Sequence, residues 1–254
     1  MSLLNKYRSP AVERALDILE YLAGAGTATL ADIVRDRGLP KSTAFVLLVT
    51  LRDRGYVIHN AEGRYQLGLR LVNLGHSAVE RIDITEVSQP VMSRLAADIK
   101  ETVHLGVLSG TSVVQVGKAE SPLAVKLTSY IGQLRPLHST AMGKTLLAFL
   151  PADEREDLLR RITLARKTPR TITRPEVLRQ ELDEVCARGY AVDDEETNMG
   201  VRCVGAPIRN YTGRVVAALS VSGPAERIPL SRVPEVAQKV MAGAQEISRA
   251  LGYL

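Results

Sequence analysis

Two amphipathic segments that meet at Gly38-Leu39-Pro40 constrain the fold more than any other feature of this sequence. In the first segment, apolar residues recur at helical spacing, and Asp32 follows Thr29 by three positions, as in a capping box. Gly38 tolerates the left-handed conformation that ends a helix, and Pro40 suits the start of the next one. The pattern predicts a helix-turn-helix, although an ordinary helical hairpin would share it.

The second helix of this pair divides into two faces. Ala44, Leu47, Leu48 and Leu51 share one face, so we expect it to be buried. The other face carries the expected DNA contacts together with Val49. The residues predicted to contact DNA are Lys41, Ser42, Thr43, Phe45, Val46 and Arg52 in this helix, and Arg64 beyond it.

The flanking sequence favours a DNA-binding domain over an isolated hairpin of helices. Strand-like runs at 55–59 and 64–67 surround a turn at 60–63, which predicts the β-hairpin of a winged helix-turn-helix. An apolar stripe from Val12 to Leu22 predicts a third helix that completes a small core.

Composition sets wide limits on function. The chain has 254 residues, 45% of them hydrophobic, which is enough for two domains. Its formal net charge is +5, and residues 1–81 hold 11 Lys and Arg against 8 Asp and Glu. This excess is compatible with a nucleic-acid partner but supports it only weakly, because duplex affinity depends on how cations cluster.

Several protein classes are not indicated. No apolar run is long enough for a membrane span and the N-terminus lacks a secretory pattern, so we expect a cytoplasmic protein. Cys186, Cys203 and the four His residues show no metal-ligand spacing, and no nucleotide or dinucleotide fingerprint occurs. We therefore expect neither a metal nor a cofactor.

The remaining sequence predicts a second, larger domain. A helical pattern over 67–81 predicts a helical linker, which would couple the arrangement of one domain to that of the other. Beyond it we expect helices and strands that build an α+β domain with a mostly antiparallel sheet. The expected helices lie near 84–95, 139–150, 152–161, 175–188 and 233–251, and the expected strands near 103–108, 112–116, 190–193, 202–209 and 215–221. The predicted division is 1–66, a linker at 67–83, and 84–254.

Over essentially its whole length the sequence resembles the IclR family of bacterial transcription regulators. The resemblance is carried in order by residues 14–20, 38–43, 136–144, 189–196, 200–208 and 218–223. It implies an N-terminal winged helix-turn-helix, a C-terminal GAF-like effector domain, and a homodimer or homotetramer bound to a double-stranded DNA operator. It also implies a small-molecule effector, often a small carboxylic acid or an aromatic catabolite.

One position departs from the family pattern. Val46 stands where the family commonly carries an arginine, so a phosphate or base contact is missing there. Phe45, Val46 and Val49 then form an apolar face suited to thymine methyl groups. The alternative is that these side chains pack against the wing or a neighbouring helix.

The resemblance also implies an effector pocket lined by Ala141, Met142, Asp193, Cys203, Ser220 and Ser222. Residues 140–143 open a helix, whose N-terminal N–H groups suit a carboxylate. Ser220 and Ser222 alternate along a strand and so share a face. Leu134 or Leu137 would add apolar lining, and Arg135 would attract an anion. Each of these residues has a structural alternative, such as Asp193 capping a turn.

The sequence is also compatible with two other functions. Cys203 with His104 or His138 and Asp193 would supply the groups of a cysteine-dependent enzyme, but catalysis needs their geometry and no nucleophile motif accompanies them. The second domain could instead serve oligomerisation alone. We expect a transcription regulator controlled by a bound effector, and not an enzyme.

Overall fold

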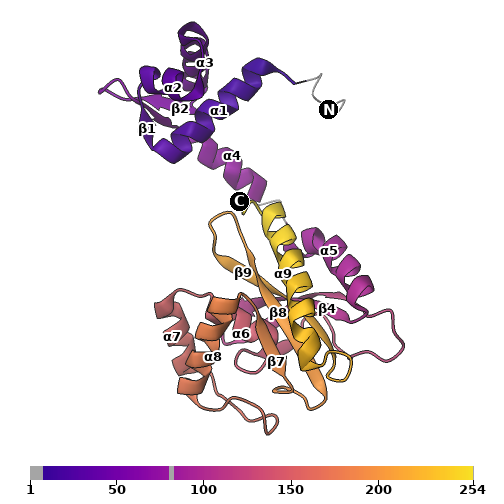
Figure 1. The fold of residues 1–254 in the computed structure, drawn as a ribbon. Helices are drawn as coiled ribbons and strands as arrows, with labels where there is room; N and C mark the ends of the chain where they lie inside the picture. The colour runs from indigo at the N-terminus through magenta and orange to yellow at the C-terminus, as the bar shows by residue number, and fades with distance from the viewer. Residues whose placement is uncertain (1–7, 80–82, 254) are drawn as a thin grey trace. The chain divides into compact units, whose positions relative to one another are not determined.

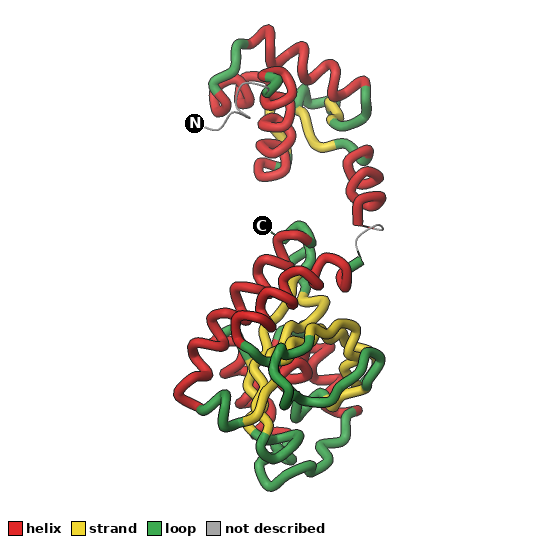
Figure 2. The backbone as a smooth tube through the Cα atoms, turned by 90° about the vertical axis from the view of Figure 1, so that its right-hand side faces the viewer, coloured by secondary structure: helices red, strands yellow, loops and turns green. Residues whose placement is uncertain are grey.

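The computed structural model describes residues 8–79 and 83–253. Contacts within the chain divide it into two compact units, residues 1–81 and 82–254, and each has its own core. Figures 1 and 2 show the helices and strands of each unit.

The first unit combines helices with a three-stranded antiparallel sheet of order β1-β3-β2. Ile18, Ala44 and Leu48 are fully buried between them. The elements are α1 (Pro10–Ala25), β1 (Thr27–Ala28), α2 (Leu30–Arg37), α3 (Lys41–Asp53), β2 (Val57–His59), β3 (Tyr65–Leu67) and α4 (Arg70–Val79).

The predicted helix-turn-helix is confirmed in α2 and α3. Thr29 Oγ1 accepts a hydrogen bond from Asp32 N at 3.2 Å, and Asp32 Oδ2 accepts one from Thr29 N at 3.0 Å, which completes the capping box. Gly38 ends α2 with φ 62°. β2 and β3 pair as the expected wing hairpin.

The predicted helix over 67–81 begins later than expected. Leu67 pairs with Val57 in the hairpin, and Gly68 N donates to Tyr56 O at 2.8 Å, so these residues extend the strand and its turn. The helix α4 starts at Arg70 and reaches Val79. Residues 80–82 of the predicted linker lie outside the described residues. β1 was not predicted, because a strand of two residues is too short to show an alternating pattern.

The second unit is built on a six-stranded sheet of order β6-β5-β4-β9-β8-β7, in which every pairing is antiparallel. This confirms the expected α+β architecture. Its elements are α5 (Ile84–Ile99), β4 (Thr102–Ser109), β5 (Ser112–Ala119), β6 (Leu134–Pro136), α6 (Ala141–Ala148), α7 (Ala152–Arg161), α8 (Pro175–Arg188), β7 (Ala191–Asp194), β8 (Val201–Arg209), β9 (Val215–Pro224), a 3-10 helix (Leu230–Arg232) and α9 (Val233–Ala250).

Two hydrophobic clusters lie against the two faces of this sheet. One joins α5 and α9 to Leu105 and Leu219, while the other joins α6, α7 and α8 to Val113 and Ala218. Leu219 and Ala218 are neighbours in β9 and point to opposite faces, as strand geometry requires. Both faces are therefore covered by helices (Figure 1).

Candidate functional site

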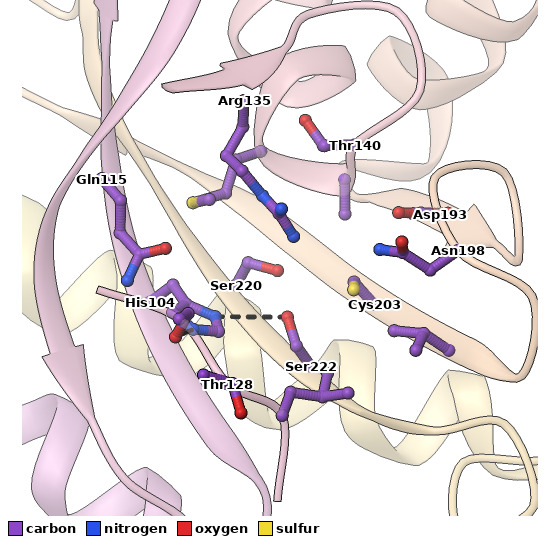
Figure 3. Close-up of a pocket in the computed structure, with 15 residues that line it drawn as sticks. His104, Gln115, Thr128, Arg135, Thr140, Asp193, Asn198, Cys203, Ser220 and Ser222 are labelled. Atoms are coloured by element: carbon purple, nitrogen blue, oxygen red, sulfur yellow. Dashed lines mark hydrogen bonds between the residues drawn. The ribbon is translucent and has the colours of Figure 1, made fainter. Parts of the chain in front are cut away.

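A cavity of about 180 Å³ lies in the second unit, where the start of α6 meets the sheet. Ten of its fifteen lining residues carry polar or charged side chains (Figure 3). The lining residues are His104, Gln115, Leu127, Thr128, Ser129, Arg135, Thr140, Ala141, Met142, Asp193, Asn198, Val201, Cys203, Ser220 and Ser222.

All six residues that the sequence suggested for an effector pocket line this one cavity. Strand register explains part of this convergence, because Asp193 lies opposite Cys203, and Cys203 lies opposite Ser222. Ser220 and Ser222 share a face of β9, as their alternation predicted. Of the expected apolar lining, Leu137 is instead buried in the core against α6, and Leu134 is exposed outside the cavity.

The start of α6 presents its backbone to the cavity. Thr140 caps the helix: its Oγ1 accepts from Gly143 N at 3.0 Å and donates to Pro136 O at 2.6 Å. The N–H groups of Ala141 and Met142 have no acceptor within the helix, since they belong to its first turn. A β-carbon on Gly143 would lie 2.4 Å from Leu137 O, so only glycine allows this close approach.

Asp193 has the structural role that the sequence left open. Its Oδ1 accepts hydrogen bonds from the backbone N of Glu196 at 2.8 Å and of Thr197 at 3.2 Å. Burial raises the pKa of this carboxyl group above its usual value, although these hydrogen bonds oppose the shift. Asp193 therefore fixes the turn that forms one wall of the cavity and also lines it.

His104 is a cavity residue that the pocket prediction missed. Its Nδ1 lies 3.2 Å from Ser222 Oγ, and its Nε2 lies 2.9 Å from Ser129 Oγ. Burial, followed by the charges of Arg135 and Lys118, lowers its pKa to about 3, so the ring is neutral. His104 pairs with Ser220 across β4 and β9, and a correct register would have revealed it.

Other missed residues come from loops and from β5. Thr128, Ser129 and Asn198 lie in loops, and Gln115 lies in β5 beside the unpredicted strand β6. Arg135 in β6 lines the cavity and gives it a cationic group, as the sequence suggested.

The surroundings of Cys203 do not produce a nucleophile. Burial raises the pKa of its thiol to about 12, so the thiolate needed for attack is absent near neutral pH. Within the described parts of the chain, His, Cys, Asp and Glu side chains nowhere gather in a group of three or more that could hold a metal. No helix among residues 8–79 and 83–253 is long and apolar enough to span a bilayer.

The outer face of α3 is a second candidate site. Phe45 and Val46 are 52% and 61% exposed, whereas Val49 is half-buried. Lys41 and Ser42 lie exposed at the start of α3, and Thr43 beside them is half-buried. The two apolar side chains at positions 45 and 46 thus do not pack into the core of the first unit.

Two of the expected cationic contacts have partners inside the first unit. Arg64 donates from Nε to Thr27 Oγ1 at 3.0 Å and from a terminal nitrogen to Thr27 O at 3.3 Å. These bonds tie the wing to β1, so two of the five guanidinium N–H donors are already occupied. Arg52 pairs with the neighbouring Asp53 at 3.1 Å on the exposed surface.

Comparison with known proteins places both units in one family. Residues 11–60 match the IclR helix-turn-helix domain, and residues 76–249 match the bacterial transcriptional regulator IclR C-terminal domain. The HTH-type transcriptional regulator XynR of Escherichia coli K12 is 39% identical, over 95% of this chain and 97% of that protein. The HTH-type transcriptional repressor AllR of Klebsiella pneumoniae is 36% identical, over 95% of this chain and 90% of that protein.

Solved structures agree with these matches. The Agobacterium tumefaciens repressor BlcR superposes with a TM-score of 0.81 at 29% identity, covering 96% of this chain and 98% of BlcR. The Thermotoga maritima IclR gives a TM-score of 0.65 at 34% identity, covering 95% and 98%. The relatives carry the names of transcriptional regulators, which agrees with a DNA-binding function and not with an enzyme.

Proposed function

Because the chain belongs to the IclR family of bacterial transcriptional regulators, we propose that its affinity for an operator is controlled by a small organic acid bound in the cavity of the second unit. The convergence of six residues from α6, β7, β8 and β9 on one cavity carries this proposal. An oligomerisation domain alone would not need a polar cavity of this kind.

A carboxylate fits the electrostatics of the cavity. The first-turn N–H groups of α6 point outward from the positive end of the helix, and Arg135 adds a full positive charge. Ser220 and Ser222 supply hydroxyl donors. No Phe, Tyr or Trp is among the lining residues, so a small aliphatic acid fits this lining better than an aromatic catabolite.

For DNA recognition we propose that α3 enters the major groove. Lys41, Ser42 and Thr43 would position its N-terminus on the phosphates, and Phe45 and Val46 would contact thymine methyl groups. Arg52 and Arg64 would add contacts to the DNA phosphate backbone on either side of these residues. Arg64 would use the N–H donors that are not bonded to Thr27. A homodimer or a tetramer would present two such helices to successive half-sites in the cytoplasm.

Effector control requires that the acid bind the DNA-competent and DNA-incompetent states with different affinity. The test uses the full chain and a duplex site selected from a random pool. A panel of small carboxylates is screened by thermal shift, and each hit is added to a DNA-binding titration. We expect a hit to raise the melting temperature, to change DNA affinity by about 5-fold or more, and to be recovered intact.

Paired variants sharpen this test. Ser220→Ala with Ser222→Ala should abolish the thermal shift, while Ser93→Ala, an exposed serine on α5, should leave it unchanged. No shift with any acid would favour the assembly-only alternative, and chemical conversion of the acid would overturn the assignment as a regulator.

A further inference from the structure

Gln115 is the one residue of the cavity wall with an unused buried amide nitrogen. The residue is 1% exposed, and its Nε2 has no hydrogen-bond partner among the described residues. Its backbone is fully engaged, because Gln115 N donates to Gln133 O at 3.0 Å and its carbonyl accepts from Gly132 N at 2.7 Å. The backbone is thus fixed while the side chain is directed into the cavity (Figure 3).

A β-bulge places this side chain on the cavity side of the sheet. Leu105 pairs with Gly117 and Gly106 pairs with Gln115, so Val116 is an extra residue in β5. Val116 and Gly117 both face the α5 side: Val116 packs on that core, and a β-carbon on Gly117 would touch Leu105. Bulges commonly redirect side chains next to functional sites.

On the same face of β5, the neighbouring buried position carries an apolar side chain. Val113, two residues earlier on the same face, is buried in the core against α6. A buried amide without a partner is unfavourable, and such groups call for an explanation in a folded protein. Other polar groups of the cavity wall already have partners within the protein, such as His104 with Ser222 and Asp193 with the backbone of Glu196.

We propose that Gln115 recognises an oxygen of the bound acid other than its carboxylate, either a hydroxyl or a carbonyl. This inference rests on the proposed carboxylate site and refines it. An amide offers a donor and an acceptor at the same place, so it matches groups that give or accept a hydrogen bond. The effector is then a hydroxylated or keto acid, and Gln115 rejects the plain alkanoate of equal length because that leaves its amide unpaired.

The experiment compares two matched series of acids on the full-length protein by calorimetry and thermal shift. Glycerate, threonate and gluconate are the hydroxylated series, and propionate, butyrate and hexanoate are their counterparts. The best hydroxylated acid should bind about 10-fold more tightly than its alkanoate. Gln115→Met should remove that preference from both sides, weakening the binding of the hydroxylated acid and tightening that of the alkanoate, because no amide is then left unpaired.

Two controls separate recognition from structure. Gln133→Met alters another amide with a buried unpartnered atom that does not line the cavity, and it should keep the preference. Without any acid, Gln115→Met should melt at or above the wild-type temperature, because Nε2 has no hydrogen bond to lose among the described residues. A lower melting temperature would assign Gln115 a structural role instead.

The outcomes distinguish the two proposals. If both series bind the wild type equally, or if Gln115→Met keeps the preference, the role of Gln115 is overturned while the carboxylate site survives. If neither series binds and no other carboxylate does, the carboxylate site and the role of Gln115 are both overturned.

Discussion

Lys144 of α6 and Glu196 of the loop after β7 form a buried ion pair behind the cavity wall. Lys144 also contacts Glu181 of α8 at 3.1 Å, and its side chain is only 1% exposed. Lys144 follows Ala141 and Met142 in the same short helix, and the backbone of Glu196 is held by Asp193. The pair therefore connects two walls of the cavity, so its loss should affect both stability and ligand binding.

At about pH 8, where Glu196 is ionised, replacing Lys144 by Met should destabilise the second unit by about 3 kcal/mol, because it leaves Glu196 and Glu181 without their buried cation. Native-state hydrogen exchange of the buried β9 amides measures this free energy. Arg94→Met, which removes an exposed partner of Glu246, should cost less than about 1 kcal/mol. Equal losses in the two variants would contradict a structural role for the buried pair.

Glu196 should make the second unit less stable as pH rises from about 4.5 to 7. Burial raises its folded-state pKa to about 7, outweighing the attraction of Lys144, and its Oε2 has no partner among the described residues. Below the unfolded-state pKa, Glu196 is protonated in both the folded and the unfolded chain, and its full contribution to the stability of the folded state is present. Between the two pKa values only the unfolded chain releases the proton, so stability falls by about 3 kcal/mol and then levels off.

The measurement of this pH dependence compares the free energy of unfolding of the wild type with that of Glu196→Gln. Their difference should change across this window, while the exposed Glu226→Gln should track the wild type. Parallel curves for the wild type and Glu196→Gln would show that the carboxyl group does not hold its proton in the folded state.

Gly143→Ala should displace the start of α6 and weaken carboxylate binding. The added methyl group meets backbone atoms of Leu137 at 2.4 to 2.7 Å, and backbone cannot move aside as a flexible side chain would. We expect a loss of about 1–3 kcal/mol in the second unit. Gly24→Ala in α1 meets nothing within 4 Å and should be neutral or slightly stabilising. Calorimetric melting of the full chain reports both effects.

Local chemistry explains why most elements were predictable. α8 begins with Pro175 at its first position and is followed by Gly189 with φ 83°, so both ends are marked in the sequence. β1 and β6 have two and three residues, and they exist only because β3 and β5 pair with them across long sequence separations. Strands this short contain too few residues to show the alternating pattern from which a strand is predicted.

The residues of the candidate site also fall into two groups, those that the sequence indicated and those that only the folded structure reveals. The resemblance supplied Ala141 and Cys203, and strand alternation supplied a shared face for Ser220 and Ser222. Two contacts from distant strands hold Ser129 at the cavity: Lys118 Nζ donates to its carbonyl at 2.8 Å, and His104 Nε2 lies 2.9 Å from its hydroxyl. Contacts of this kind depend on the folded sheet and have no local sequence signal.

Cys203 and Cys186 should react at very different rates with iodoacetamide near pH 8. Burial raises the pKa of the Cys203 thiol to about 12, whereas Cys186 is exposed, with a pKa raised by partial burial. Mass spectrometry should find Cys186 modified first and Cys203 modified only after addition of denaturant. Rapid labelling of native Cys203 would reopen the possibility of a reactive thiol.

The exposed face of α3 can be tested with a selected duplex site over a range of salt concentrations. Lys41→Ala should lower the slope of log affinity against log salt by about 1, because one phosphate contact is lost. Val46→Arg should raise the slope by a similar amount by adding such a contact. Arg94→Ala, which removes an exposed cation of the second unit, is the matched control and should change nothing.

Phe45→Ala separates apolar base contacts from phosphate contacts. Because Phe45 is uncharged and 52% exposed, its removal should weaken binding to the selected site about 10-fold and leave the salt slope unchanged. Binding to random duplex should change little, since phosphate contacts dominate it. If Phe45→Ala instead lowered the melting temperature and left both DNA affinities intact, the side chain would be packing against protein. The apolar face of α3 would then have no part in reading the operator.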